Sequence, residues 1–475
     1  MKINVPRDGL RSTNVRPGFA ADGVTRPHEG RLPTRTLQSR DRYYRRILSE
    51  RMTCLPTLKQ TVTRGLRRLA MWGPGLLVML ADCDAGNVVT AAQAGAQTGL
   101  RLLPVLLALV PLLYMIQELT VRLGIFTGRG YGELIRSRFG PVWAALAAAG
   151  LVVAVLGSLV TEFTGVAGVG EMYGVSRAVT LPLAVVLLTG IVLTGSHKRV
   201  DRIAIAIGAF DLTFFAVAWS ARHQLQIMVP QMTHLAAGGR EAGYLAAALI
   251  GATFNPWMVF YQQAAVADSL TAKDFTSARV ETAVGAVLTQ LLTAAVLVAA
   301  AATLSAHGEP RSLDSIGEIS NALVAVTGPF AGRLLFGAGV LGAALVAAIV
   351  SSLALAWGLG DVFGYRASLE VRPGRAPWFY GAYVLAVAGS AWAVWLAPDL
   401  VSLNVAAQVL NTLMLPLVLG LLVALSLTAL PQRYRPRGTY LWLVVFVGAV
   451  VCAAGAWGAV QGLRPSLAIA GLPIL

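Results

Sequence analysis

The chain has 475 residues, of which 56% are hydrophobic and 13% are charged, and its mean hydropathy is +0.67. Such a sequence is too apolar for a water-soluble globule, and its repeated apolar stretches of about twenty residues indicate a polytopic membrane protein. The cysteines Cys54, Cys83 and Cys452 are far apart and follow no CxxC spacing, so they indicate neither a disulfide framework nor a zinc site.

The first 70 residues carry much of the net charge of +15, with 16 Lys or Arg against five acids. They contain no apolar run and no small-residue cleavage site, so we do not expect a signal peptide. Basic residues before a first span fix its orientation and attract anionic lipid. Residues 1–70 are therefore predicted to form a basic, disordered cytoplasmic tail, and no nucleic-acid partner is expected.

The apolar stretches predict eleven membrane spans, and the charges of the connecting loops predict their direction. Lys and Arg gather after spans 2, 4, 6, 8 and 10, as in Arg136, Lys198 and Lys273. Because such residues favour the cytoplasmic side, the N-terminus is predicted to lie inside and the C-terminus outside, in a plasma (inner) membrane. The predicted spans are 73–97, 102–124, 142–170, 179–195, 202–220, 244–267, 280–304, 333–360, 377–397, 401–430 and 439–462.

Polar residues and helix breakers interrupt the first and the sixth span at their middle. The interruptions are Asp84-Ala85-Gly86-Asn87 and Thr253-Phe254-Asn255-Pro256-Trp257. Non-helical backbone at membrane depth occurs where protein or a water-filled cavity satisfies its polar groups, and paired breaks indicate the site of a transporter. Two five-span halves then have opposite orientations. We expect an all-α, LeuT-type inverted 5+5 repeat with broken helices 1 and 6 and an eleventh helix.

This reading divides the chain into five parts. The expected boundaries are a tail at 1–70, a first repeat at 71–220, an extracytoplasmic loop at 221–243, a second repeat at 244–430, and helix 11 with a C-terminal tail at 431–475.

Several motifs resemble those of the Nramp metal transporters. Asp84-Ala85-Gly86-Asn87, followed by Gln93 to Gln97, is similar to the first span of that family, whose motif reads Asp-Pro-Gly-Asn. Gln117 to Glu133 resembles the second span and its loop, Gly251-Ala252-Thr253 opens the sixth-span motif, and Gln408 to Pro416 resembles the tenth span. The resemblance extends from about residue 70 to residue 430.

The resemblance implies a metal site at the two breaks, and one departure concerns its chemistry. Where Nramp manganese and iron transporters carry Met-Pro-His, this chain has Asn255-Pro256-Trp257. An amide oxygen thus replaces a soft sulfur, which favours a hard cation such as Mg²⁺. The expected metal ligands are Asp84, Asn87, the carbonyl of Ala252, Asn255 and Gln408.

Each of these ligands also has a structural interpretation. Asn87 and Asn255 are also suited to capping the half-helices at the breaks, and Gln408 to an interhelical hydrogen bond. Asp82 is either a vestibule residue that holds a metal-bound water or a buried acid paired with a neighbour. Glu162 is either a vestigial buried acid or a vestibule charge, and Trp257 either a packing or gating residue or a wall of the ligand shell.

A second departure concerns protons. Trp257 replaces the sixth-span histidine of the Nramp symporters, Gly165 stands in place of the second acid of the third span, and the ninth span has no basic residue. These changes resemble the Nramp-related magnesium transporters. We therefore expect a carrier of Mg²⁺, and also Mn²⁺, that works by alternating access without proton coupling.

Two other functions fit parts of the pattern. One is a proton-coupled Mn²⁺/Fe²⁺ symporter of the Nramp type, and the other is a Na⁺-coupled symporter of organic substrates on the same fold. No nucleophile constellation or phosphate-binding loop suggests an enzyme. The expected partners are a divalent metal cation and the lipid bilayer, with no obligate protein partner and no cofactor besides the transported ion.

Overall fold

The computed structural model describes residues 74–194, 197–220, 239–305, 312–327, 329–365, 369 and 371–469. The predicted tail at 1–70 and residues 221–238 of the predicted loop lie outside this part of the chain. Every regular element of the described residues is a helix, as the apolar spans predicted.

The helices of the first half follow the predicted spans closely, with one additional helix and two differences in the fifth span. A short helix, α5, lies between the second and third spans. The fifth span is divided by a 3₁₀ turn at Ala209–Leu212, and its first helix starts five residues before the predicted span. The helices are α2 (Pro74–Asp82), α3 (Ala85–Thr98), α4 (Leu103–Thr127), α5 (Tyr131–Phe139), α6 (Pro141–Met172), α7 (Arg177–Leu193), α8 (His197–Gly208) and α9 (Thr213–Ser220).

The second half repeats the pattern of a broken first span. It also contains an unpredicted helix, α14, between the seventh and eighth spans, and α11 begins five residues before the predicted sixth span. The helices are α11 (Gly239–Thr253), α12 (Pro256–Ser269), α13 (Phe275–Ala300), α14 (Ile316–Thr327), α15 (Pro329–Phe363), α16 (Pro377–Leu396), α17 (Leu400–Thr428) and α18 (Gly438–Ile469).

Eight segments of the described chain are long and apolar enough to cross a membrane, when α11 and α12 are taken together. The other three predicted spans are present as shorter helices. Two of them are interrupted, at α2–α3 and at α8–α9, and α7 has 17 residues. The protein is therefore a multi-pass membrane protein, whereas the count of eleven crossings and the orientation of the termini remain predictions.

Proline and glycine set several of the helix ends. Proline occupies the start of α6, α12 and α16, where its fixed φ suits the first turn and its missing N–H costs nothing. Gly128 follows α4 with φ +62°, a left-handed conformation that glycine adopts without a steric penalty. The chain can therefore turn sharply into α5.

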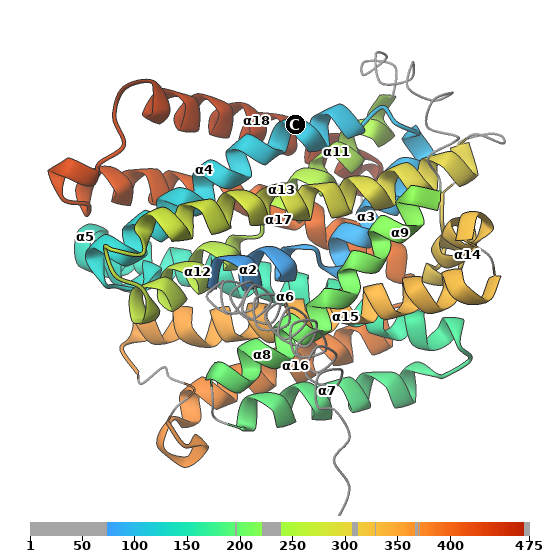
Figure 1. Ribbon diagram of the computed structural model, residues 1–475, viewed down its shortest axis with the longest axis horizontal. Helices are drawn as coiled ribbons and strands as arrows, with labels where there is room; N and C mark the ends of the chain where they lie inside the picture. Colours follow the sequence, from blue (N-terminus) through green and yellow to red (C-terminus); the bar gives the residue numbers. More distant parts are fainter. Residues whose placement is uncertain are drawn as a thin grey trace, which may run out of the picture. The chain divides into compact units, whose positions relative to one another are not determined.

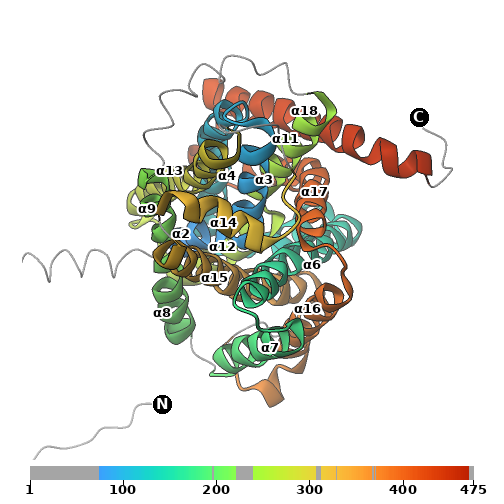
Figure 2. The same cartoon turned by 90° about the vertical axis from the view of Figure 1, so that its right-hand side faces the viewer.

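The two broken helices lie at the centre of the helical bundle. Helix α3 contacts α6, α11, α13 and α17, and 13 of its 14 residues are buried, so protein rather than lipid surrounds it. Figure 2 shows α7 and α18 at opposite edges, with α2, α3 and α12 between them. In Figure 1 the short helix α2 lies among the long helices of both halves. The topology thus places the predicted site in the interior.

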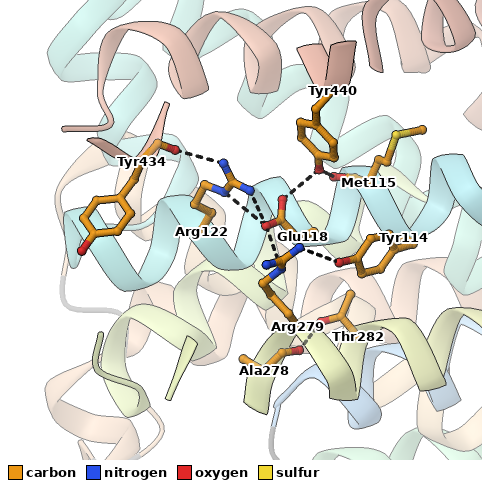
Figure 3. Close-up of polar contacts among 9 residues, drawn as sticks. All are labelled: Tyr114, Met115, Glu118, Arg122, Ala278, Arg279, Thr282, Tyr434 and Tyr440. Atoms are coloured by element: carbon orange, nitrogen blue, oxygen red, sulfur yellow. Dashed lines mark hydrogen bonds and ion pairs between the residues drawn. The ribbon is translucent and has the colours of Figure 1, made fainter. Parts of the chain in front are cut away.

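One buried carboxylate ties the first half to the second, as Figure 3 shows. Glu118 of α4 is fully buried, and its Oε1 pairs with Arg122 at 2.5 Å and with Arg279 of α13 at 3.3 Å. Its Oε2 accepts a hydrogen bond from the hydroxyl of Tyr440 on α18 at 2.8 Å. Glu118 and Arg122 thus form a structural pair, whose network joins α4, α13 and α18.

Candidate metal-binding site between the two broken helices

The first break lies between α2 and α3, and Asp84 stands at its centre. The backbone of Asp84 is extended, with φ −81° and ψ 173°, and its Oδ1 accepts the N–H of Asn87 at 2.6 Å. Asp84 therefore caps α3, and the positive end of the α3 dipole favours its negative charge. The second carboxylate oxygen points to the other break.

The second break lies between α11 and α12 and has a different local structure. Asn255 occupies the N-cap position of α12, but its side chain makes no capping hydrogen bond. Its amide instead donates to Asp84 Oδ2 at 3.3 Å and to the carbonyl oxygen of Ala252 at 3.2 Å. The capping interpretation of Asn255 is therefore wrong, and its side chain joins the two breaks.

Asn87 completes the connection between the breaks. Its side-chain amide donates to the carbonyl oxygen of Ala252 at 3.0 Å and to that of Asp82, while its own Oδ1 has no hydrogen-bond partner. A buried amide oxygen without a donor is uncommon, because losing its contacts with water is costly. Asp84, Asn87, Ala252 and Asn255 are each at most 2% exposed. Four of the five predicted ligands thus lie together at one buried position between the two breaks.

The fifth predicted ligand, Gln408, reaches this place through a neighbour. Asn411 of α17 donates to Asn255 Oδ1 at 2.7 Å and to Gln408 Oε1 at 3.0 Å, while Gln408 Nε2 has no partner. Gln408 also lies against α3, since a Cβ atom added at Gly86 would be 1.9 Å from its Nε2. Only glycine at position 86 permits this approach. Gln408 is a helix-to-helix contact as well as a neighbour of the site.

Asn411 belongs to the site and was not predicted. It lies seven residues after Asn404 and three after Gln408, so the three side chains share one face of an otherwise apolar helix. Three buried amides in a row are expensive in a membrane helix and therefore indicate a functional face. This pattern in the sequence was the signal that identifies Asn411.

Glu162 of α6 contacts the first break, and Trp257, which follows the second break, contacts α6. Glu162 Oε2 accepts the N–H of Ala85 at 3.1 Å, and the indole N–H of Trp257 donates to Ser158 Oγ at 3.1 Å. Both residues are fully buried. Glu162 therefore holds the start of α3, and Trp257 packs against α6.

Asp82 is fully buried, and neither of its carboxylate oxygens has a hydrogen-bond partner among the described residues. Its role, as a holder of metal-bound water or as a buried acid paired with a neighbour, stays a prediction.

Two cavities of very different size approach the site. A cavity of about 720 Å³ lies between the end of α3 and the beginnings of α11 and α17, and its lining includes Gln93, Gln97, Glu241, Tyr244 and Val405. At the other end of the site, beside Gln117 and Asn255, the cavity measures about 10 Å³. Asn255 of the site lines the smaller cavity, whereas none of the five predicted ligands lines the larger one.

The composition of the site decides which ligands it offers. No group of three His, Cys, Asp or Glu suited to a metal occurs in the described residues. The carboxylate of Asp84 accepts hydrogen bonds from the main-chain N–H of Asn87 and the side-chain amide of Asn255, and the carbonyl oxygen of Ala252 accepts from the side-chain amides of both asparagines. Of the two amide oxygens, that of Asn87 has no hydrogen-bond partner and that of Asn255 accepts from Asn411. Such an arrangement of oxygens is suited to a cation that keeps part of its water shell.

A family model described as natural resistance-associated macrophage protein-like, or Nramp, matches residues 75–461. The chain belongs to this family. Membership confirms the resemblance seen in the motifs and the expectation of a transporter rather than an enzyme. The match does not distinguish between branches of the family, so the resemblance to its magnesium transporters stays a prediction.

Individual Nramp relatives are similar over most of their length. The divalent metal cation transporter MntH of Deinococcus radiodurans is 31% identical over 336 residues, which cover 64% of this chain and 71% of the relative. MntH of Yersinia enterocolitica is 28% identical over 311 residues, covering 60% of this chain and 71% of the relative.

Solved structures confirm the predicted fold. A manganese transporter of Eremococcus coleocola superposes with a TM-score of 0.61 at 16% identity, covering 84% of this chain and 87% of that one. MhsT, solved in complex with L-phenylalanine, superposes with a TM-score of 0.55 at 14% identity, covering 81% of this chain and 98% of that one. The described helices therefore adopt the LeuT-type fold of these transporters.

Proposed function

We propose that this protein carries divalent metal cations through a membrane by alternating access, with Mg²⁺ as the preferred substrate and Mn²⁺ as a second one. The observation that carries the proposal is the buried cluster of Asp84, Asn87, Ala252 and Asn255 where the two breaks meet, in which the Asp84 carboxylate contacts both breaks and the Asn87 amide oxygen has no hydrogen-bond partner. Relatives of the chain are named as divalent metal cation transporters, which supports the class of substrate.

The preference for Mg²⁺ rests on the hardness of these ligands. None of the five predicted ligands carries sulfur, and Asn255 supplies an amide where the family resemblance places a methionine. Carboxylate, carbonyl and water oxygens suit Mg²⁺, whereas thioethers favour softer transition metals. Mg²⁺ also dehydrates reluctantly and is commonly bound through one or two carboxylates with several waters retained.

The absence of proton coupling rests on three positions and their surroundings. Trp257 donates a hydrogen bond to Ser158 and has no titratable group. A Cβ atom at Gly165 would lie 2.5 Å from that of Ala85, which leaves no room for the acid that the family resemblance places there. Helix α16 contains no basic residue. The path of titratable side chains along which a proton would cross the membrane is therefore interrupted.

The membrane potential is a sufficient driving force for such a carrier. A divalent cation gains about 4.6 kcal/mol for each 100 mV of an inside-negative potential, twice the value for a single charge. In the orientation that the loop charges predict, the cavity of about 720 Å³ opens to the outside. Cations then enter beside Gln93 and Gln97 and move down the potential.

A second candidate is a proton-coupled Mn²⁺/Fe²⁺ symporter. The observation in its favour is Glu162, a fully buried acid that contacts the start of α3 beside Asp84. Intramembrane acids often serve as proton carriers. Selectivity and coupling together separate this candidate from the first.

Asn255→Met tests the selectivity directly. We expect the uptake ratio of Cd²⁺ to Mg²⁺ in proteoliposomes to rise about tenfold or more, which corresponds to about 1.4 kcal/mol, because a thioether replaces a hard oxygen. Met258→Leu is the matched control. It removes a buried sulfur one turn away from Asn255, at a residue that has no predicted role. An unchanged ratio in Asn255→Met contradicts the proposed basis of selectivity.

A further inference from the structure

Asp82 is the last residue of α2 and lies two positions before Asp84. Its side chain is fully buried, and neither carboxylate oxygen makes a hydrogen bond. Burying a carboxylate without hydrogen bonds or a counter-charge is strongly unfavourable. An acid in this condition therefore indicates a positively charged partner that the folded chain itself does not supply.

The surroundings of Asp82 direct its side chain to the site rather than to a structural partner. Its main-chain carbonyl accepts a hydrogen bond from the Asn87 amide, and the Asn255 side chain lies close to its carboxylate. The four described ion pairs lie elsewhere, at Arg122, Arg129, Arg177 and Arg279.

No described ion pair joins Asp82 to a basic side chain of the helices that pack against α2. These helices are α8, α12, α13 and α15, and the basic side chain of α13 that is described in a contact, Arg279, pairs with Glu118. Glu162, the third buried acid of this region, differs from Asp82 because Ala85 and Thr161 donate to its oxygens. Asp82 and Asp84 are thus two buried carboxyl groups that none of the described ion pairs includes.

We propose that Asp82 is the second carboxylate of the cation site, accepting hydrogen bonds from water bound to the transported ion. This inference rests on the proposed function and deepens it. With Asp84, the residue supplies two negative charges, which a divalent cation neutralises. The site therefore selects ions by two separate means. The charge of Asp82 favours divalent over monovalent cations, while the amide of Asn255 favours hard over soft ones.

The substitution Asp82→Asn in the full-length protein tests this role, because it keeps the size of the side chain and removes its charge. Loss of a partner that holds metal-bound water typically weakens binding by about 10–100-fold. In proteoliposomes, we expect the KM for Mg²⁺ to rise by about that factor. The KM for Cd²⁺ rises equally, so that the ratio of the two stays as in wild type. Asp82→Glu keeps the charge and recovers part of the affinity.

Thermal unfolding of the purified protein distinguishes this role from a structural one. Without metal, Asp82→Asn melts at the same temperature as wild type or higher, because it removes one of two buried like charges. With Mg²⁺ added, its gain in melting temperature is smaller than that of wild type, since a ligand stabilises in proportion to its binding. A lower melting temperature without metal, together with an unchanged gain, overturns the proposal.

The failure of this inference can be told apart from the failure of the proposed function. If Asp84→Ala loses Mg²⁺ uptake while Asp82→Asn keeps the wild-type KM, Asp82 has no part in the site and the transporter function stands. If Asp84→Ala transports Mg²⁺ like wild type, the site itself is misplaced. A change in the Cd²⁺ to Mg²⁺ ratio in Asp82→Asn also overturns the inference, because a charge acts on both ions alike.

Discussion

Asp84→Ala is expected to reduce Mg²⁺ uptake by at least about 100-fold. This loss equals or exceeds the loss of about 10–100-fold that is typical when a residue supporting a metal ligand is removed. The carboxylate oxygens of Asp84 contact residues of both breaks, Asn87 and Asn255. Its removal leaves amide and carbonyl oxygens without the negative charge that compensates for a cation's lost water. Dye-based uptake in proteoliposomes, at matched protein content, measures the effect.

Asp399→Ala is the matched control, because Asp84 also caps a helix. Asp399 caps α17 by accepting the N–H groups of Val401 and Ser402, and it is not among the residues of either break. Loss of a cap costs about 1 kcal/mol of stability, so this variant should fold and transport. If both variants lose uptake equally, capping rather than metal binding explains the effect. Unchanged uptake in Asp84→Ala excludes the site.

Gly251→Ala is expected to have the largest effect on structure among single methyl additions near the site. A Cβ atom at this position would lie 1.8 Å from the carbonyl oxygen of Gln408 and 2.5 Å from Thr412 Oγ1. Main-chain atoms cannot move aside as a flexible side chain can, so α11 and α17 must separate. Overpacking of this kind typically costs about 1–3 kcal/mol. The melting temperature in detergent and the rate of Mg²⁺ uptake should both fall.

Gly420→Ala provides the comparison, since a Cβ atom there meets nothing within 4 Å. It lies within α17, where alanine forms helix better than glycine. Its melting temperature should equal or exceed that of wild type. Equal melting temperatures of Gly251→Ala and Gly420→Ala contradict the close approach of the two helices.

The sequence was sufficient to predict most of the fold. The apolar stretches located the long helices, and Asp84 with Pro256 marked both breaks, because a buried acid and a proline interrupt helical hydrogen bonding in ways that lipid cannot satisfy. Helices α5 and α14 were not predicted, since they are too short to span a membrane and lie within stretches interpreted as loops. Gly208 ends α8, and nothing in the hydropathy of the fifth span indicated this division.

The site was predicted in part. The inverted repeat requires the two breaks to meet, and the resemblance to the Nramp motifs then pointed to the four expected ligands at the breaks. The contact of Gln408 with Gly86, and the position of Asn411 between Gln408 and Asn255, depend on how α17 packs against α3 and α11. Sequence spacing shows which residues share a helix face, but not which neighbouring helix that face contacts.

Mg²⁺ uptake into proteoliposomes that contain a pH-sensitive dye tests most directly whether a hydrated divalent cation moves alone through this site. With an inside-negative potential and no pH gradient, we predict that Mg²⁺ enters the lumen while the luminal pH stays constant. Mn²⁺ should enter likewise without acidification. Uptake of Mn²⁺ accompanied by luminal acidification, with no uptake of Mg²⁺, would contradict the proposed function and favour the proton-coupled symporter.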